Sequence, residues 1–224
     1  MKTIGGKAGR PLSFDRSAAL RAAMLAFWRH GYETTSIVDL TTAMGITAPS
    51  LYAAFGDKQQ LFLEAVALYV GDPAEVARAI DEAKSAFQAA SDLLDAVAIT
   101  YTGEETPSGC LLASATATGS SGACDVRRVV AGIRRDLATQ LARRIDRDIA
   151  DGLLPADCDA NGLADLIVAV TQGMSALARD GGTRAQLIAV AHAAMKAWPE
   201  RPEPSRPAST EWASKKPTST ESEG

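Results

Sequence analysis

Apolar residues recur along most of the chain with the period of an α-helix. In the first such segment they stand at i, i+3, i+4 and i+7 and form one stripe: Leu20, Ala23, Met24 and Phe27. Ser13 or Asp15 can cap this helix, and His30-Gly31 provides its end. The pattern predicts an amphipathic helix from about residue 15 to residue 30.

Two short helices are predicted next, over 37–44 and 48–55, with Ser36 and Thr47 as their N-caps. They are joined by Gly45-Ile46-Thr47, and a tight glycine-containing turn between two short helices is typical of a helix-turn-helix. The apolar positions expected to fix the angle between them are Ile37, Leu40, Met44, Ile46, Leu51 and Phe55. In such a motif the second helix enters the DNA major groove.

The remaining sequence is also helical in pattern, with breaks at glycine and proline. Helices are predicted over 58–69, 73–86, 88–102, 108–118, 125–151, 159–179 and 183–197. The expected fold is therefore all-α. We divide it into a flexible basic arm (1–13), a three-helix helix-turn-helix domain (14–58), a larger helical domain (59–198) and a disordered tail rich in Pro, Ser and Thr (199–224).

Composition supports this assignment and excludes several classes of protein. Aromatic residues make up only 5% while alanine is abundant, which favours helices over strands. No apolar run reaches 18 residues, so we expect no membrane span and a cytoplasmic location. The three cysteines (Cys110, Cys124 and Cys158) and two histidines lack the spacing of a disulfide framework or a metal site, so neither metal nor cofactor is expected.

Charge is unevenly distributed between the two ends of the chain. Residues 1–60 contain seven Lys/Arg and four Asp/Glu, hence +3, which leaves −7 for the rest of a chain whose net charge is −4. A basic head on an acidic body is consistent with a DNA-binding protein that has a separate regulatory domain.

The sequence also resembles a known family. The run GYETTSIVDLTTAMGITAPSLYAAFGDKQQLF is similar to the N-terminal signature of the TetR family of transcriptional regulators, and the similarity covers about residues 14–70. By position, the resemblance implies DNA-contact roles for Ser36, Thr47, Tyr52 and Lys58. With neighbouring small or polar residues, the predicted DNA-binding set is Thr35, Ser36, Thr47, Ala48, Pro49, Ser50, Tyr52 and Lys58.

The recognition helix departs from a typical base reader because it has few long polar side chains. It contains Pro49 and several alanines instead. Sequence specificity is therefore expected to come from Ser50 and Thr47, from contacts of alanine with thymine methyl groups, and from DNA shape. The arm with Lys2, Lys7 and Arg10 either enters an adjacent minor groove or stays solvated.

The resemblance further implies a regulatory domain that dimerises and binds a small molecule. Segment 159–179 is more apolar than a one-sided helix needs, so we expect helices 125–151 and 159–179 to form a four-helix interface with a second subunit; burial within one subunit is the alternative. The candidate ligand-binding residues, chosen by helix position, are Phe87, Tyr101, Cys110, Leu111, Gln172 and Met174. Few charges lie in these helices, so an apolar or aromatic effector is expected.

Cys110 lies in a segment, Ser108 to Leu112, that resembles a branch of the same family. It could be a thiol sensor, but no Lys, Arg or His is close to it in sequence, so a buried structural cysteine is favoured.

The predicted function is that of a ligand-responsive regulator: a dimeric repressor that binds palindromic operator DNA through helix 48–55 and is released by its effector. Activation instead of repression stays open. An enzyme is disfavoured, since the sequence contains no phosphate-binding loop, metal spacing or nucleophile elbow. An interaction scaffold with a vestigial head is the other alternative.

Overall fold

The computed structural model describes residues 14–114 and 124–199. The predicted arm, the end of the predicted helix 108–118 and nearly all of the predicted tail lie outside these residues. The described parts form ten helices: α1 (Arg16–His30), α2 (Ile37–Met44), α3 (Ala48–Phe55), α4 (Lys58–Val70), α5 (Pro73–Glu82), α6 (Ala86–Tyr101), α7 (Leu111–Ser114), α8 (Cys124–Ala150), α9 (Ala160–Arg179) and α10 (Arg184–Met195).

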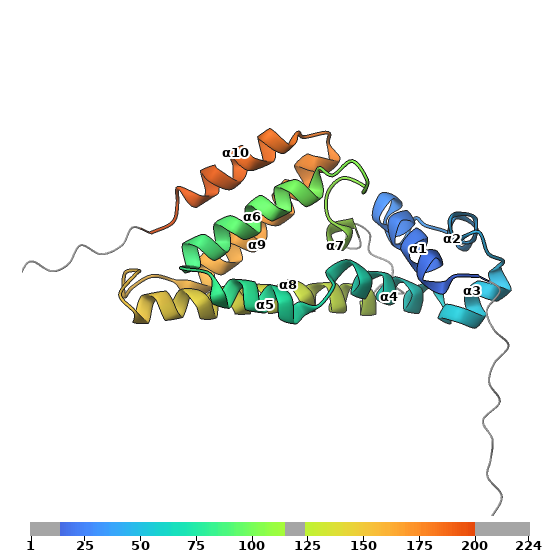
Figure 1. Cartoon of the computed structure of the whole chain (residues 1–224), viewed down its shortest axis with the longest axis horizontal. Coiled ribbons are helices and arrows are strands. Elements are labelled where there is room, and N and C mark those ends of the chain that lie inside the picture. Colours follow the sequence, from blue (N-terminus) through green and yellow to red (C-terminus); the bar gives the residue numbers. More distant parts are fainter. Residues whose placement is uncertain (1–13, 115–123, 200–224) are drawn as a thin grey trace, which may run out of the picture.

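The first three helices form a small head at one end of the elongated molecule (Figure 1). Helix α1 packs against α2 and α4, and it begins at Arg16 because the Asp15 carboxylate accepts hydrogen bonds from the backbone N–H groups of Ser17 and Ala18. Helix α4 leads from the head into the body. Phe27 of α1 and Phe62 of α4 meet edge to face in the core of the head, with 5.0 Å between ring centroids.

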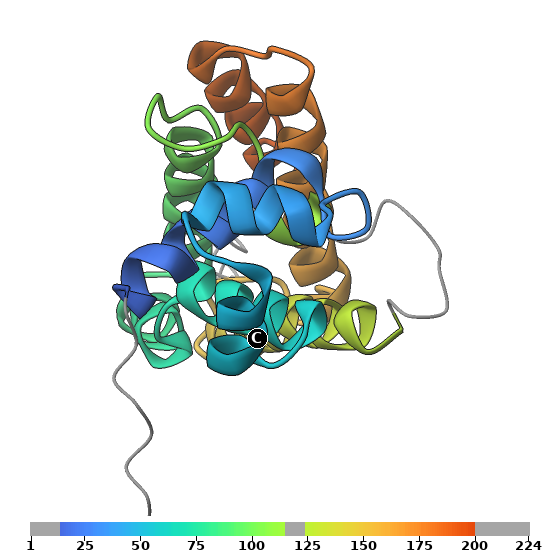
Figure 2. The same ribbon diagram turned by 90° about the vertical axis from the view of Figure 1, so that its right-hand side faces the viewer.

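The body is a set of packed helices in which α9 is central. It contacts α8, α6 and α10, while α5 lies on α8 along one long edge (Figure 1). When the molecule is turned by 90° so that the head faces the viewer, α1 crosses in front of these body helices (Figure 2). Large side chains with almost no exposure, among them Leu94, Leu141, Ile167 and Met174, fill the space between the body helices.

Two helix predictions need correction. The predicted helix 108–118 is, in its described part, a turn at Gly109 followed by the single helical turn α7. Helix α5 ends at Glu82 instead of residue 86, because Ala83 adopts extended backbone (ψ 149°) and Ser85 caps α6 by accepting from the N–H of Gln88. Sequence periodicity could not resolve this break, since Ala83 and Ala86 suit either helix.

No described helix is long and apolar enough to cross a membrane. Within the same residues, no group of three or more His, Cys, Asp or Glu side chains is arranged to hold a metal ion.

Candidate DNA-binding surface

Helices α2 and α3 are held at a fixed angle by the predicted apolar wedge. Four of its members, Leu40, Met44, Leu51 and Phe55, are buried, while Ile37 and Ile46 are partly buried against the same core. The turn depends on Gly45, whose left-handed backbone (φ 64°, ψ 31°) lets its N–H reach the carbonyl oxygens of Thr41 and Thr42. This arrangement is the helix-turn-helix expected from the sequence.

Both short helices have well-formed N-termini. Ser36 and Asp39 form a reciprocal capping box, and their hydrogen bonds lower the pKa of the Asp39 carboxyl. Thr47 caps α3 by accepting from the N–H of Ser50 at 3.3 Å, and its Oγ1 also lies 2.9 Å from the Ser50 hydroxyl. Pro49 occupies the first turn, where a missing N–H costs little. Helix ends of this kind favour phosphate oxygens.

The outer face of α3 is exposed at several predicted positions. Thr47, Pro49 and Tyr52 are exposed, Tyr52 with 50% of its surface accessible, while Ala48 and Ser50 are half-buried. In Figure 1, α3 lies at the extremity of the head, away from the body. The structure thus brings most of the predicted set onto one accessible surface formed by the N-terminus and outer side of α3, with Ser36 at the start of α2.

Thr35 does not belong to that surface. Its side chain is 1% exposed, and its hydroxyl donates to the carbonyl oxygen of Gly31 at 2.6 Å. The prediction of a DNA contact by this side chain is wrong, because its hydroxyl instead ties the start of the α2 segment to the end of α1.

Lys58 is bound more tightly to the protein than a solvated lysine. Its ammonium donates to the carbonyl oxygen of Glu33 at 3.2 Å and lies 4.8 Å from the centroid of the Tyr32 ring. Partial burial lowers the pKa of Lys58, and the nearby charge of Glu33 opposes that shift. The charge is therefore placed beside the loop between α1 and α2.

Arg16 was not identified from the sequence; it contacts the C-terminal end of α3 on the side that faces the core. Its Nη2 donates to both carboxylate oxygens of Glu64 at 2.8 Å and to the carbonyl oxygen of Ala54 at 3.1 Å, and its guanidinium lies 4.3 Å from the centroid of the Phe55 ring. It thereby joins α1, α3 and α4. No local sequence pattern indicates that Arg16 joins these helices, because in the sequence it is only a basic residue at the start of a helix.

The predicted ligand-binding residues fall into separate places. Tyr101, Cys110, Leu111 and Met174 are all buried in the body. Burial, together with contact to Cys110, raises the pKa values of Tyr101 and of Tyr69, and the Tyr69 hydroxyl lies 3.4 Å from the Cys110 sulfur. Tyr69 was not predicted from the sequence.

Gln172 is half-buried beside that cluster, whereas Phe87 lies apart from it. Gln172 lines a cavity of about 260 Å³ with His30, Gly31, Ala113, Ser114, Ser175, Ala176 and Arg179. Phe87 is 44% exposed, packs against Trp198 and stands fourteen residues before Tyr101, about 21 Å along α6. Grouping Phe87 with the others was wrong, because helix position alone does not say which end of α6 faces the cluster.

Comparison with known proteins agrees with this geometry. The profile of the bacterial regulatory proteins, tetR family, matches residues 19–65, and that of the tetracyclin repressor-like C-terminal domain matches residues 91–195. The chain belongs to the TetR family of transcriptional regulators.

Individual TetR-family proteins are similar over most of the chain. The HTH-type transcriptional repressor ComR of Escherichia coli (strain K12) is 36% identical over 194 residues, which are 86% of this chain and 92% of ComR. The repressor BdcR of the same organism is 29% identical over 185 residues, 82% of this chain and 88% of BdcR. A cysteine variant of the TetR-family regulator CifR, solved with 26-bp double-stranded operator DNA, is 41% identical with a TM-score of 0.79, covering 85% of this chain and all of that one.

Proposed function

We propose that this TetR-family member is a repressor that binds palindromic operator DNA as a dimer and is released by a small-molecule effector. The observation that carries the proposal is the free outer face of α3, with Thr47, Pro49 and Tyr52 exposed on a helix whose inner face is locked by Leu51 and Phe55. The similarity to the repressor ComR and to operator-bound CifR supports it.

In this proposal α3 lies in the major groove and the N-termini of α2 and α3 receive phosphate oxygens. Tyr52 reaches the DNA backbone, and Lys58 adds a positive charge at the edge of the same surface. Since α3 offers few long polar side chains, much of the specificity comes from contacts of small side chains with base edges and from DNA shape.

Binding to the DNA upstream of the protein's own gene, measured by fluorescence anisotropy, tests this function. Tyr52→Ala is expected to weaken binding about tenfold or more, in the range of a lost hot-spot contact. Phe87→Ala is the matched control, because Phe87 is an aromatic residue of similar exposure on the body. Absence of specific binding by the wild type at low salt, or equal losses in both variants, would contradict the proposal.

The dimer interface is proposed to centre on α9. One stripe of its exposed positions recurs at helical spacing and is small or apolar: Gly162, Leu166, Ala169, Gly173 and Leu177. The exposed polar side chains of Asn161 and Asp165 lie in the first turns of the helix. A Cβ atom added at Gly173 would meet nothing within 4 Å, which leaves a notch that a second helix can fill. The groove beside Leu177 continues onto α10 at Ala189 and Val190.

Helix α8 was the other half of the interface expected from the sequence. Its exposed positions are mostly charged, among them Arg128, Arg135, Asp136, Arg143 and Asp146. Because obligate interfaces are depleted in charge at their centre, the exposed surface favours α9 and the adjoining α10 over α8.

Sedimentation equilibrium tests the interface. The wild type is expected at twice the chain mass of 23.4 kDa, Gly173→Arg at the mass of one chain, and Thr139→Arg, on the exposed side of α8, at twice the mass. If Thr139→Arg is a monomer and Gly173→Arg is a dimer, the interface is formed by α8 and not by α9.

The effector is proposed to bind at the junction of head and body, in the cavity lined by Gln172 and Arg179. This cavity adjoins the end of α1 at His30 and Gly31 and touches α7, so an occupant would contact both the head and the body. Coupling of typical size, ~1–3 kcal/mol, would loosen operator binding about 5- to 150-fold. A thermal-shift screen of small aromatic compounds, repeated with Gln172→Ala, tests the site: hits whose shift is unchanged by the substitution would exclude it.

A further inference from the structure

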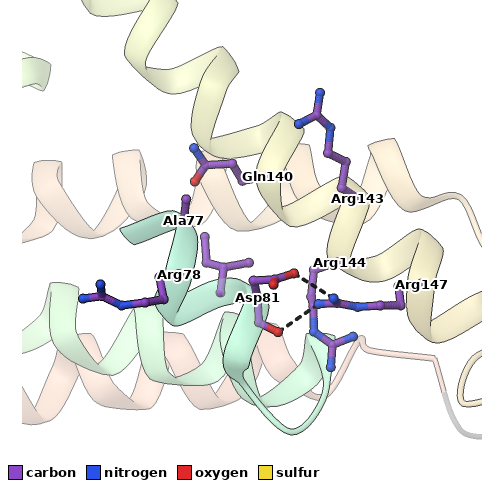
Figure 3. Close-up of a pocket in the computed structure, with 8 residues that line it drawn as sticks. Ala77, Arg78, Asp81, Gln140, Arg143, Arg144 and Arg147 are labelled. Atoms are coloured by element: carbon purple, nitrogen blue, oxygen red, sulfur yellow. Dashed lines mark hydrogen bonds and ion pairs between the residues drawn. The ribbon is translucent and has the colours of Figure 1, made fainter. Parts of the chain in front are cut away.

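A second cavity, of about 530 Å³, lies on the body between α5 and α8 (Figure 3). Its lining is rich in arginine: Ala77, Arg78, Ile80 and Asp81 from α5, and Gln140, Arg143, Arg144 and Arg147 from α8. Four arginines thus meet a single lining carboxylate. This concentration of positive charge stands on the part of the chain whose net charge is negative.

Two of these arginines are already neutralised within the protein. Arg147 pairs with Asp81, with 2.7 Å between Nη1 and Oδ1, and it also donates to the Asp81 carbonyl oxygen at 2.9 Å. Arg144 forms a buried ion pair with Asp148 and donates to the carbonyl oxygen of Ala83 at 3.0 Å. These contacts fix the floor of the cavity.

One buried hydrogen-bond donor of this lining has no partner within the described residues. The Arg144 side chain is only 7% exposed, and its buried Nε–H has no hydrogen-bond partner. A buried donor without an acceptor is costly, so an acceptor that reaches this N–H would be favoured. Among the described residues, Arg78 and Arg143 have neither a hydrogen-bond nor an ion-pair partner, and both are exposed at the rim.

The geometry points to a binding site for a small oxyanion between α5 and α8. Guanidinium groups stay charged at every physiological pH and match carboxylate and phosphate oxygens with paired N–H donors. In Figure 3, Arg78 and Arg143 extend from opposite helices, in different directions and away from the Asp81–Arg147 pair, so both side chains would have to change rotamer to hold one ligand between them. The ligand class is a small carboxylate or phosphate compound carrying at least two negative charges, which would offset the two unpaired arginines.

This site is separate from the effector cavity at Gln172 and from the α3 surface, and the inference does not depend on the function proposed above. Its occupant would hold α5 against α8.

The experiment measures the melting temperature of the full chain against increasing pyrophosphate, citrate or sodium chloride at matched ionic strength. Pyrophosphate or citrate is expected to raise the melting temperature saturably, by about 3–6 °C at ten times the Kd, while chloride is not. If the melting temperature saturates at a lower concentration of pyrophosphate than of citrate, phosphate is the preferred ligand chemistry; the reverse order identifies carboxylate. A two-dimensional NMR spectrum of the arginine Nε–H groups is expected to show the Arg144 signal shifting during the same titration.

The double variant Arg78→Ala/Arg143→Ala is expected to fold normally and to lose the ligand-dependent shift, because neither side chain has a protein partner among the described residues. Arg135→Ala, also exposed on α8 but outside the cavity lining, is the matched control and should keep it. A wild-type shift no larger than that with chloride, or equal losses in the double variant and Arg135→Ala, would overturn the inference. So would a double variant that binds random-sequence DNA more weakly yet still binds pyrophosphate.

Discussion

Trp28 of α1 donates its indole N–H to the backbone carbonyl oxygen of Gly109, with 3.0 Å between the two atoms. Arg179 of α9 adds two hydrogen bonds at the same place, to the carbonyl oxygens of Trp28 at 3.2 Å and of Cys110 at 3.0 Å. The Cys110 N–H in turn donates to the Ser175 hydroxyl at 2.8 Å. The turn at Gly109-Cys110 thus links α1 of the DNA-binding head to α9 of the body, in addition to the connection through α4.

Trp28→Phe is expected to lower the free energy of unfolding by about 1–3 kcal/mol, because it leaves the buried Gly109 carbonyl without the indole donor. Urea denaturation measures the change. Trp198→Phe is the control, since Trp198 is half-buried and contacts Phe87 at its ring edge, and its effect should stay within ~0.5 kcal/mol. Equal losses in the two variants would show that the indole hydrogen bond does not matter.

Gly109→Ala is expected to destabilise the protein more than Gly181→Ala. Both glycines have positive φ (77° and 92°), so each substitution incurs a backbone cost of about 1–2 kcal/mol. At Gly109 the new Cβ would also lie 2.8 Å from the carbonyl oxygen of Ser175, whereas at Gly181 nothing lies within 4 Å. Crowding should therefore lower the free energy of unfolding of Gly109→Ala by a further ~1–3 kcal/mol, which thermal or urea unfolding can measure. Similar losses in Gly109→Ala and Gly181→Ala would rule out the close contact.

Thr35→Val tests the corrected role of Thr35. Loss of the hydroxyl bond to Gly31 should lower the free energy of unfolding by about 1 kcal/mol. Operator affinity of the folded variant should stay within about twofold of the wild type, because the side chain is buried. Anisotropy measured well below the melting temperature checks this, and a tenfold loss there would restore a direct DNA contact.

Alkaline pH should weaken the fold through Tyr69 and Tyr101. Burial raises the pKa of both phenols above the ordinary value of 10.0, so the folded state favours their neutral forms. The resulting stability is fully present below pH 10 and is lost as pH rises above it, because only the unfolded chain then releases the protons readily. Urea unfolding at increasing pH measures this loss.

The matched variant for that series is Tyr69→Phe/Tyr101→Phe, which cannot ionise at these positions. Its free energy of unfolding should depend less on pH above 10 than that of the wild type. Parallel curves for the two proteins would show that other groups cause the alkaline loss.

Local sequence signals were sufficient for the head. Capping residues such as Ser36 and Thr47, and the turn at Gly45, act within four residues, so the predicted bounds of α2 and α3 are confirmed by the structure. The exposed side of α3 follows from the same periodicity, because Leu51 and Phe55 define the opposite, buried side.

Contacts between distant segments could not be predicted in this way. Arg16 meets Ala54 and Glu64 across 38 and 48 residues, and Arg144 reaches Ala83 across 61. Nothing in the sequence next to Arg16 or Arg144 indicates those partners. Position along a predicted helix does not say which neighbour covers each end of α6, which is why Phe87 was misplaced.

The contacts of Arg16 also bear on how operators would be ranked. Because this guanidinium already holds the carboxyl end of α3, the recognition helix requires little ordering when it docks, and its shape is nearly the same for every sequence it meets. Differences in binding free energy would then arise on the nucleic-acid side. Base steps that bend or narrow readily would be preferred even at positions that no side chain reaches.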